Sequence, residues 1–478
     1  MMADVPEQWL RKTTREERRM SRSSKKIDML DGPLWSRMII FALPLALTGM
    51  LQQLFNAADV AVLGRFVSNE AMAGVGNNVP IIGLIISFCM GLALGANVVV
   101  AQCLGMKDEQ KANRAVHTAF ATAVIFGIVA VLVGEGFAGP AMDWLDVPAS
   151  VRPDAEMYLR VFLLGFPFIA IYNFLAAVMR SQGDTQTPLW ALLAASVFNI
   201  AGNLVAVLFF DWGAGGVALA TVLANGLAAA LLFVKLLRTE GPLHLDIKQC
   251  MRVDGASLKP IVRIGWPAGL QGAVFSLSNL IIQAAINSLG PEVMAGSVAA
   301  FTVEINVYCF INAFGLAATT FVSQNYGAGN LARCRRATWV SMGLNFVATV
   351  LMIAVIVSFG RHLLSLFTDS SDVIELAMTR IYWVVLFEPI SVVMETVSDA
   401  MRGYGYSMPP AMVTLFCVCS VRVIWVWTVF AAHHDYIVLM MVYPVSWAVT
   451  AVALCWLYWR HQKILEKKPR FAKAASGD

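Results

Sequence analysis

The chain has 478 residues, of which 58% are hydrophobic and 14% are charged, and its formal net charge at pH 7 is +4. A soluble globular domain carries about 25% charged residues, so this composition excludes a soluble protein and indicates one that lies in a membrane. The eight cysteines form no CxxC pair with metal-ligand spacing. We expect them to serve as small apolar packing residues, without a metal or another cofactor.

Apolar segments of about 20 residues, the length that crosses a hydrocarbon layer as an α-helix, recur along nearly the whole chain. Backbone amides in lipid must be paired within their own segment, so these segments predict helices. We therefore predict an all-α integral membrane protein with twelve transmembrane helices, at residues 38–63, 79–104, 115–136, 158–179, 188–210, 214–237, 264–288, 298–323, 338–360, 376–400, 409–431 and 436–460.

Lysine and arginine residues are distributed unevenly over the predicted loops. The arm at 1–37, the tail at 461–478 and every second loop hold nearly all of them, whereas the other loops hold only Arg65, Arg152 and Arg361. Because cytoplasmic loops carry the excess of basic residues, we expect a multi-pass protein of the bacterial inner membrane with both termini in the cytoplasm. The basic arm can contact the anionic lipid bilayer, and we expect no nucleic-acid partner.

The chain contains an internal repeat at a constant offset of 222 residues. This offset aligns Met72-Ala73-Gly74 with Met294-Ala295-Gly296, Gln102 with Gln324, Gly105 with Gly327, Arg114 with Arg336, Pro167 with Pro389, Met179-Arg180 with Met401-Arg402, Gly183 with Gly405, and Pro188 with Pro410. Six helices in each half, an even number, give two parallel repeats. We divide the chain into a basic arm at 1–37, a first lobe at 38–237, a cytoplasmic linker at 238–262, a second lobe at 263–460 and a basic tail at 461–478.

The first predicted helix is apolar, yet it carries Gln52, Asn56 and Asp59. Spacings of four and three residues place these side chains on one helix face. A carboxylate in hydrocarbon is costly, so an acid inside a membrane helix is a functional-site hypothesis. The alternative is that Asp59 lies close enough to the helix end to reach headgroup water.

The first lobe holds three further polar residues, Asn199, Asn203 and Thr221, whose counterparts in the second lobe are apolar or aromatic. Asp59, Asn203 and Thr221 each lie about four to seven residues, or about 6–11 Å, from the outer end of their helix. Oxygen atoms of these types at one depth favour a site for a coupling cation, either a proton or a sodium ion held by Asp59 and Asn203. Hydrogen bonding between helices is the alternative role for the amides and the hydroxyl.

The second lobe has charged residues of its own. Arg422 in the eleventh helix lies about as far from the cytoplasmic ends as Glu388 in the tenth. An arginine in hydrocarbon requires a partner, so we predict a structural ion pair between Glu388 and Arg422. Such a pair leaves Glu395 free to titrate.

A substrate cavity between the lobes is predicted to be lined by polar and acidic residues of both halves. In the eighth helix, Glu304 and Tyr308 would receive an organic cation through charge and cation–π attraction. A hydrogen-bonded, structural Glu304 is the equal alternative. The complete predicted set is Gln52, Asn56, Gln283, Glu304, Tyr308, Asn312 and Glu395.

Three segments together resemble the multidrug and toxic-compound extrusion (MATE) transporters: ADVAVLGRFVSNEAMAGVG at 58–76, MRSQGDTQTP at 179–188 and FVSQNYGAGN at 321–330. The resemblance extends from about Leu34 to Trp459 and includes the duplication. It implies two six-helix lobes around a cavity that opens to either side in turn. It also implies export of amphipathic, often cationic compounds, driven by inward flow of sodium ions or protons.

The resemblance implies roles for residues of the first lobe. Asp59 matches the family's cation-site acid, Asn199 and Asn203 match an Asn-x-x-x-Asn pair in the fifth helix, and Thr221 matches a threonine of the sixth. Several family members carry an acid in the seventh helix, where this chain has only Gln271, Asn279, Gln283 and Asn287. We therefore expect ion coupling in the first lobe.

Two other functions compete with this reading. A lipid-linked saccharide flippase of the same superfamily would line its cavity with basic residues for a pyrophosphate, and few basic residues lie deep in the predicted helices. An intramembrane enzyme needs a constellation such as paired histidines, but the six histidines are scattered or near loops. We predict a monomeric secondary active transporter, not an enzyme, that exports small amphipathic cations by antiport.

Overall fold

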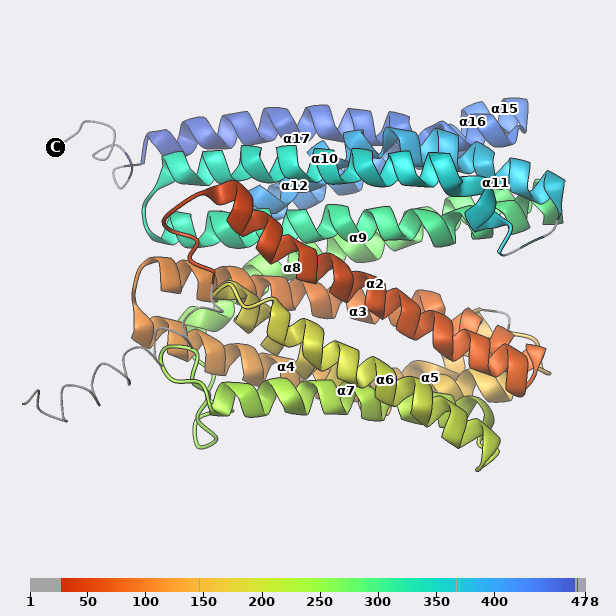
Figure 1. The fold of residues 1–478 in the computed structure, drawn as a ribbon, viewed down its shortest axis with the longest axis horizontal. Helices are drawn as coiled ribbons and strands as arrows, with labels where there is room; N and C mark the ends of the chain where they lie inside the picture. The colour runs from red at the N-terminus through yellow and green to blue at the C-terminus, as the bar shows by residue number, and fades with distance from the viewer. Residues whose placement is uncertain (1–26, 146, 367, 369, 469–470, 472–478) are drawn as a thin grey trace, which may run out of the picture.

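The structure is a computed structural model that describes residues 27–145, 147–366, 368, 370–468 and 471. Most of the predicted basic arm and the end of the tail lie outside the described residues. Within them the chain is all helical, with no strand, and twelve helical stretches are long and apolar enough to cross a membrane (Figure 1). The predicted fold class is confirmed.

The first half contains six unbroken helices. They are α2 (Leu34–Phe66), α3 (Asn69–Gly105), α4 (Glu109–Trp144), α5 (Arg152–Ser181), α6 (Gln186–Leu208) and α7 (Gly213–Leu237). Most extend beyond the predicted bounds, because a helix continues past the hydrocarbon until a cap or a turn ends it. Ser68 and Asp108, for example, cap α3 and α4 by accepting hydrogen bonds from the backbone N–H groups of Ala71 and Lys111.

The second half repeats this plan but interrupts its last three spans. Its continuous helices are α8 (Gly255–Asn287), α9 (Pro291–Gly327) and α10 (Leu331–Leu364). The tenth span consists of α11 (Ser371–Val384), the 3₁₀ turn η1 (Val385–Phe387) and α12 (Glu388–Gly403). The eleventh consists of α13 (Met408–Thr414), the π-helical turn η2 (Leu415–Cys419), α14 (Ser420–Trp425), the π-helical turn η3 (Val426–Phe430) and α15 (Ala431–His433), and the twelfth of α16 (Tyr436–Met440) and α17 (Val442–Glu466).

The break in the tenth span coincides with a proline. Pro389 stands in the first turn of α12, where its missing N–H cannot continue the hydrogen bonds of α11, although its repeat counterpart Pro167 lies inside the continuous helix α5. The π-helical turns η2 and η3 each accommodate an extra residue and therefore shift the side chains beyond them relative to an unbroken helix. The second lobe is thus the less regular copy of the repeat.

The two lobes exchange parts of their first helices. The beginning of α2, with Met38 and Phe41, packs into a core shared with Phe321 and Met401 of the second half. The beginning of α8, with Ile261, packs into the core of the first half. Figure 1 shows α2 in red running obliquely from the second-half helices to the first-half helices. Each lobe is therefore anchored in the other at one end of the molecule.

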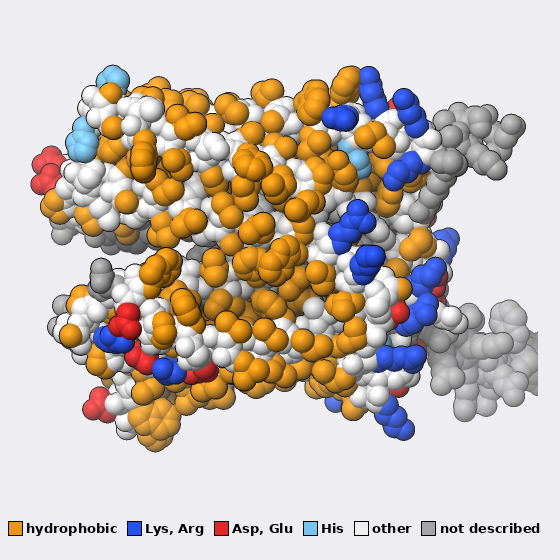
Figure 2. Space-filling view, turned by 180° about the vertical axis from the view of Figure 1, so that it is seen from behind, with side chains coloured by type: hydrophobic (Ala, Val, Ile, Leu, Met, Phe, Trp, Pro, Cys, Tyr) orange, Lys and Arg blue, Asp and Glu red, His pale blue; other side chains and the backbone are white. Residues whose placement is uncertain are grey.

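This end, which we call the basic end, carries Lys107, Lys111, Arg238, Arg333 and Arg335 in or next to the loops α3–α4, α7–α8 and α9–α10. Figure 2 shows most of the visible lysine and arginine side chains gathered there, at the right of the view. At the opposite end, which carries the α2–α3 and α8–α9 connections and which we call the far end, Figure 2 shows a notch between the two halves. The lobes are closed together at one end and apart at the other.

Two repeat-related hydrogen bonds close the basic end. Gln102 Nε2 donates to the carbonyl of Gly403 at 2.9 Å, and Gln324 Nε2 donates to the carbonyl of Ser181 at 2.6 Å. Beside them α3 and α9 touch through backbone, because a Cβ atom on Gly105 would come within 1.9 Å of the Gln324 carbonyl oxygen. Only glycine fits this approach. Each lobe therefore holds the other through the same pair of contacts.

A segment before α2, Ile27–Pro33, lies across the same closure. Arg333 Nη2 donates to the carbonyls of Asp31 at 2.8 Å and Gly32 at 3.0 Å, and Asn325 Nδ2 donates to that of Met29 at 3.1 Å. In the first lobe the backbone of Gly183, which has a φ of +90°, packs directly against Ile27. The segment therefore contacts both lobes. A pocket of about 510 Å³ lies between it and the ends of α3 and α9.

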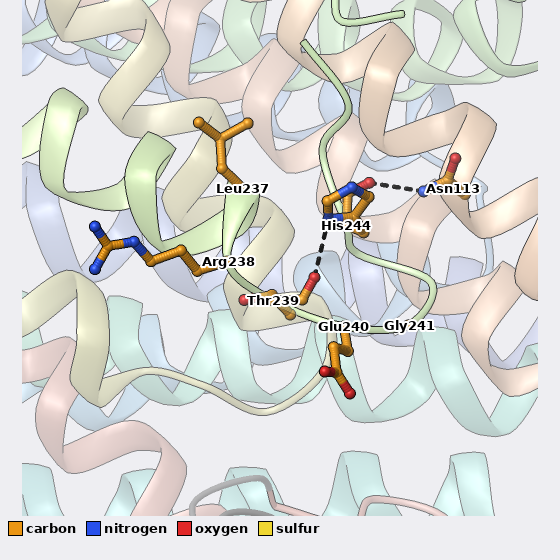
Figure 3. A pocket seen from close by; sticks show the side chains of 7 residues that line it. All are labelled: Asn113, Leu237, Arg238, Thr239, Glu240, Gly241 and His244. Carbon is orange, nitrogen blue, oxygen red and sulfur yellow. Dashed lines mark hydrogen bonds between the residues drawn. The ribbon is translucent and has the colours of Figure 1, made fainter.

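The linker between the lobes folds back on α4. Asn113 Nδ2 donates to the carbonyl of His244 at 2.7 Å, and His244 Nδ1 lies 3.0 Å from the carbonyl oxygen of Thr239. These contacts border a pocket of about 440 Å³, which Figure 3 shows from close by with Arg238 and Glu240 among its residues. Neither this pocket nor the one beside the Ile27–Pro33 segment is lined by a residue of the predicted transport sites.

Candidate functional site: a buried carboxylate in the first lobe

Asp59 of α2 lies at the centre of a buried polar cluster, with 2% of its surface exposed. The hydroxyl of Thr221 on α7 donates to Asp59 Oδ2 at 2.7 Å. The amide of Asn203 on α6 donates to Asp59 Oδ1 at 2.6 Å. Hydrogen bonds to a charged group are the short, strong class, so two neighbouring helices hold this carboxylate in position. The alternative in which Asp59 reaches headgroup water does not apply in this conformation.

Asn199 completes the cluster one helical turn from Asn203. Its Nδ2 donates to Thr221 Oγ1 at 3.0 Å, and its Oδ1 accepts from Asn203 Nδ2 at 3.4 Å. The structure thus brings together Asp59, Asn203 and Thr221, which the sequence grouped by depth, with Asn199, which shares a helix face with Asn203. Hydrogen bonding between helices, the alternative role, is also what they do here, so ion binding by these four residues stays a prediction.

The cluster is electrostatically incomplete. Asn203 Oδ1 is buried and accepts no hydrogen bond. Among the described residues no Lys, Arg or His nitrogen lies within 4.0 Å of Asp59. An ionised carboxylate without a cation is costly in a membrane interior, and an unpaired amide oxygen beside it adds to that cost. A proton on Asp59, or a small cation among the oxygens, would remove both costs, that of the uncompensated carboxylate and that of the unpaired amide oxygen.

The amide orientation of Asn203 is tied to that occupancy. With Nδ2 toward Asp59, the amide donates to an ionised carboxylate. Rotated by half a turn, it would direct Oδ1 at the carboxylate, which is acceptable only with a proton or a cation between the two oxygens. The donor set of carboxylate, amide and hydroxyl oxygens is that of a hard cation. The residues present therefore fit both a sodium ion and a proton.

Local sequence explains why the three helices meet. Asn199 and Asn203 share a face of α6 through their spacing of four. Gly202 lies between them, and a Cβ atom at this position would stand 3.1 Å from the Cβ atom of Ala220 on α7. Small residues at such a contact let two membrane helices approach closely, which brings Thr221 within reach of α6.

The predicted substrate-cavity residues differ in their surroundings. Asn56 and Tyr308 are exposed, and a further four, Gln52, Gln283, Asn312 and Glu395, are half-buried. Gln283 Nε2 donates to Asn287 Oδ1 within α8 at 2.9 Å. Tyr308 lies close enough to Glu395 to interact with it electrostatically. Their membership of one cavity stays a prediction.

Glu304 is not a cavity residue in this structure. It is buried, and its carboxylate pairs with Arg380 of α11, with Nε to Oε2 at 2.8 Å and Nη2 to Oε1 at 3.3 Å. Arg380 Nη1 also donates to Ser297 Oγ at 2.8 Å. The structural alternative for Glu304 therefore applies. Its two-point contact is the geometry in which guanidinium and carboxylate bind most strongly.

The predicted ion pair between Glu388 and Arg422 is wrong for this conformation. Glu388 contacts the hydroxyl of Ser391 in its own helix instead. Arg422 Nη1 donates to Asn279 Oδ1 of α8 at 2.6 Å, and its guanidinium lies over the rings of Phe275 and Tyr443. Depth alone suggested the pairing, whereas the lateral order of the helices places α8 and α17 beside Arg422.

Sequence reasoning missed Arg380 as the partner of Glu304. In the predicted spans 298–323 and 376–400 these two residues lie about six and about four residues from the same end, so the depth criterion that grouped Asp59 with Thr221 was a usable signal for them as well. A second buried pair, Asp399 with Arg402, was also missed. Arg402 Nη2 additionally donates to Gln271 Oε1 at 2.8 Å.

Comparison with known proteins places the chain in a family. The sequence model of the MatE family matches residues 44–205 and again residues 267–428, once in each half. The chain is 26% identical over 449 residues to the probable multidrug resistance protein YoeA of Bacillus subtilis, covering 91% of this chain and 95% of that protein. It is 28% identical over 403 residues to the probable multidrug resistance protein NorM of Thermotoga maritima, covering 80% and 83%.

Solved structures agree in fold. A crystal structure of MATE in complex with MaL6 superimposes with a TM-score of 0.86 at 19% identity, covering 92% of this chain and 99% of that one. An outward-facing multidrug resistance MATE family transporter of the MOP superfamily gives a TM-score of 0.85 with the same coverage. From the two matches of the family model and this fold, the chain belongs to the MatE family of multidrug efflux transporters and is not an enzyme.

Proposed function

We propose that this protein exports amphipathic, cationic compounds by antiport, and that the coupling ion, sodium or a proton, binds at Asp59, Asn199, Asn203 and Thr221. One observation carries the proposal: the buried Asp59 carboxylate has no cationic partner among the described residues, and the buried amide oxygen of the adjacent Asn203 has no donor. A coupling ion supplies the missing positive charge. The names of YoeA and NorM as probable multidrug resistance proteins support the substrate class.

The coupling follows from charge compensation. With Asp59 ionised and unoccupied, the cluster favours an arrangement in which water or polar donors reach the carboxylate. Occupancy removes that demand and favours a drier packing of α2 against α6 and α7. Antiport requires that ion and substrate favour different openings of the lobes, and the effect of each on the other is then reciprocal.

The notch at the far end supplies the second requirement, a space between the lobes. We propose that the substrate enters there and binds deeper between the lobes, near exposed Tyr308 and half-buried Glu395. An aromatic face and a carboxylate together attract an organic cation. Arg380 and Arg422, by contrast, are buried and engaged within the second lobe, which disfavours the flippase alternative and its need for basic residues in the cavity.

Orientation and assembly complete the proposal. The basic end faces the cytoplasm of a bacterial cell, because positively charged loops stay on that side of the inner membrane. In this orientation the notch opens outward and the paired Gln102 and Gln324 bonds seal the cytoplasmic side. The functional unit is a monomer, since both lobes and the ion cluster come from one chain.

The test is efflux of an aromatic cation such as ethidium from proteoliposomes under separate sodium and pH gradients. One of the two gradients should drive transport, and Asp59→Asn should reduce that driven rate by about a hundredfold or more because the amide cannot exchange charge. Asp143→Asn, the same change at an exposed acid of the first lobe, is the matched control. Driven transport at the wild-type rate by Asp59→Asn would refute the site.

A further inference from the structure

Arg422 is a cation with 0% of its surface exposed, and it has no anionic partner among the described residues. Nη1 donates to Asn279 Oδ1 at 2.6 Å and lies 3.4 Å from Ser278 Oγ, while Nε and Nη2 have no partner. Among the described residues no carboxylate oxygen lies within 4.0 Å of it. A merely structural arginine in a membrane protein is expected to pair with an acid, so this arrangement requires another explanation.

The groups around Arg422 are neutral and can nevertheless stabilise a cation. The ring centroids of Phe275 and Tyr443 lie 4.9 Å and 4.8 Å from its Cζ atom. Ring faces and amide oxygens attract positive charge without carrying a charge of their own. The nearby Arg380 pairs with Glu304, and its Cζ atom also lies 5.5 Å from the ring centroid of Tyr443, so the two guanidinium groups share that ring.

Arg422 lies in the second lobe at the repeat counterpart of the Asp59 cluster. Its contacts come from α8 and α17, which are the second-lobe counterparts of α2 and α7, and Arg422 itself lies in the counterpart of α6. Tyr443 is the residue that follows Thr221 by the repeat offset of 222. The same three helices that surround the Asp59 cluster in the first lobe therefore surround Arg422 in the second.

The π-helical turn η2 changes which residue of the second lobe corresponds to Asn199. By plain counting, Asn199 corresponds to Val421. The π-helical turn at Leu415–Cys419 adds a residue before this point, so the spatial counterpart of Asn199 moves one place further along the chain, to Arg422. The guanidinium therefore occupies the part of the second lobe where the first lobe has its ion site.

We propose that Arg422 is a tethered cation that permanently fills the second lobe's counterpart of the ion site. The second lobe then binds no coupling ion, and each transport cycle moves one ion through the Asp59 cluster alone. The inference rests on the proposed function, which it deepens by assigning the ion stoichiometry. The second lobe keeps its cation-bound packing throughout the cycle, and only the first lobe repacks when its ion leaves.

The requirement for charge is tested by chemical rescue. Arg422→Ala removes the cation and should lower the unfolding temperature and the driven efflux of ethidium. Free guanidinium at millimolar concentration should restore the efflux rate by about tenfold or more, since it binds the native state at the vacated position. Urea, which has the same planar shape without the charge, should not. Equal rescue by urea would overturn the proposal.

Two further variants keep this test decisive if Arg422→Ala does not fold. Arg422→Lys retains a cation and should keep most of the transport, whereas Arg422→Met, neutral and of similar length, should lose it. Arg361→Met, the same change at an exposed arginine, is the control. Wild-type transport and stability in Arg422→Met would show that no cation is needed there.

The number of ions per transport cycle is tested in the wild-type protein. At zero membrane potential, one measures the substrate gradient at which net transport stops for a given ion gradient. With one coupled ion, a tenfold ion gradient is balanced by a substrate gradient of about tenfold, and with two ions by about a hundredfold. The hundredfold result would overturn the proposal and would indicate a second ion at an acid such as Glu388. If neither ion drives transport, the proposed function fails, and the comparison of guanidinium with urea still decides whether this position requires a cation.

Discussion

The two lobes are copies of one fold whose buried charges differ. The first buries a carboxylate, Asp59, among neutral donors, and no basic side chain contacts it among the described residues. The second buries three guanidinium groups, of which Arg380 pairs with Glu304, Arg402 pairs with Asp399, and Arg422 contacts amide, hydroxyl and ring faces. Under the proposed function, the first lobe exchanges an ion, whereas the second lobe carries its positive charges on its own side chains.

The difference extends to the backbone. The first-lobe helices α5 and α6 are continuous, whereas their counterparts contain the 3₁₀ turn η1 and the π-helical turns η2 and η3. Such turns redirect side chains relative to a regular helix. A fixed arrangement can use them to place a particular charge, as with Arg422. If the first lobe exchanges an ion as proposed, its regular helices are the ones that repack, whereas the interrupted helices of the second lobe hold a fixed charge.

The largest expected difference between the lobes concerns the pair of Glu304 and Arg380. Either Glu304→Gln or Arg380→Met should destabilise the protein by about 3–5 kcal/mol, because each leaves an uncompensated buried charge. The double variant should recover part of that loss. Asp59→Asn, a neutralisation in the first lobe, should cost less than about 1 kcal/mol because its neighbours can still be satisfied. Thermal unfolding in detergent measures all four, and additive losses in the double variant would contradict the pairing.

Smaller, and different, effects are expected from substituting one asparagine in each lobe. Asn279→Ala removes the acceptor of Arg422 and should lower stability by about 1.5–3 kcal/mol, the range for a hydrogen bond to a charged group. It should leave the ion dependence of transport unchanged. Asn203→Ala should instead weaken the apparent ion affinity about tenfold, or about 1.4 kcal/mol. Ion titrations of transport together with thermal unfolding separate the two effects, and the reverse pattern would exchange the roles of the lobes.

At the basic end, where the lobes meet, equivalent substitutions in the two lobes should have equal effects. Gln102→Ala and Gln324→Ala each remove one bond of the repeat-related closure and should favour opening of the basic end equally, by about 0.5–1.5 kcal/mol. Distances between spin labels at Gln110 and Ala332, in a variant with the native cysteines replaced, measure the open population. Gln283→Ala, which removes a bond within α8, is the control. Unequal shifts would show that one lobe dominates the closure.

The smallest effect concerns how the two crossing helices begin. Asp254 caps α8 by accepting from Ser257 N at 3.1 Å, whereas α2 follows Pro33, which has no side-chain cap. Asp254→Ala should cost about 1 kcal/mol at neutral pH. The hydrogen bond from the Ser257 side chain lowers the pKa of Asp254. The cap therefore contributes fully above about pH 4, the unfolded pKa, and is lost as the pH falls through the folded value.

The control for this prediction is Asp246→Ala, a change at an acid of the same linker that caps no long helix. Unfolding curves between pH 3 and pH 7 provide the measurement, where these limits are set by about one unit on either side of an ordinary carboxyl pKa. A constant difference between Asp254→Ala and the wild type over that range would exclude an ionised cap.

Several features of this protein could be predicted from sequence for physical reasons that are local to each helix. Apolar length identified the twelve spans, because each must cross the same hydrocarbon layer. The constant offset identified the repeat. Equal depth brought Asp59, Asn203 and Thr221 together, because residues at one level in the membrane can meet if their helices are neighbours.

The tertiary structure alone decided which helices are neighbours. Glu304 and Glu388 were both acids of the second lobe within the spans, yet only Glu304 meets an arginine, and that arginine is Arg380. The crossing of α2 and α8 between the lobes and the residue added by η2 were equally invisible in the sequence. Hydrophobic pattern and charge specify depth and burial along each helix separately, whereas lateral order and rotation arise from the packing of all the helices against one another.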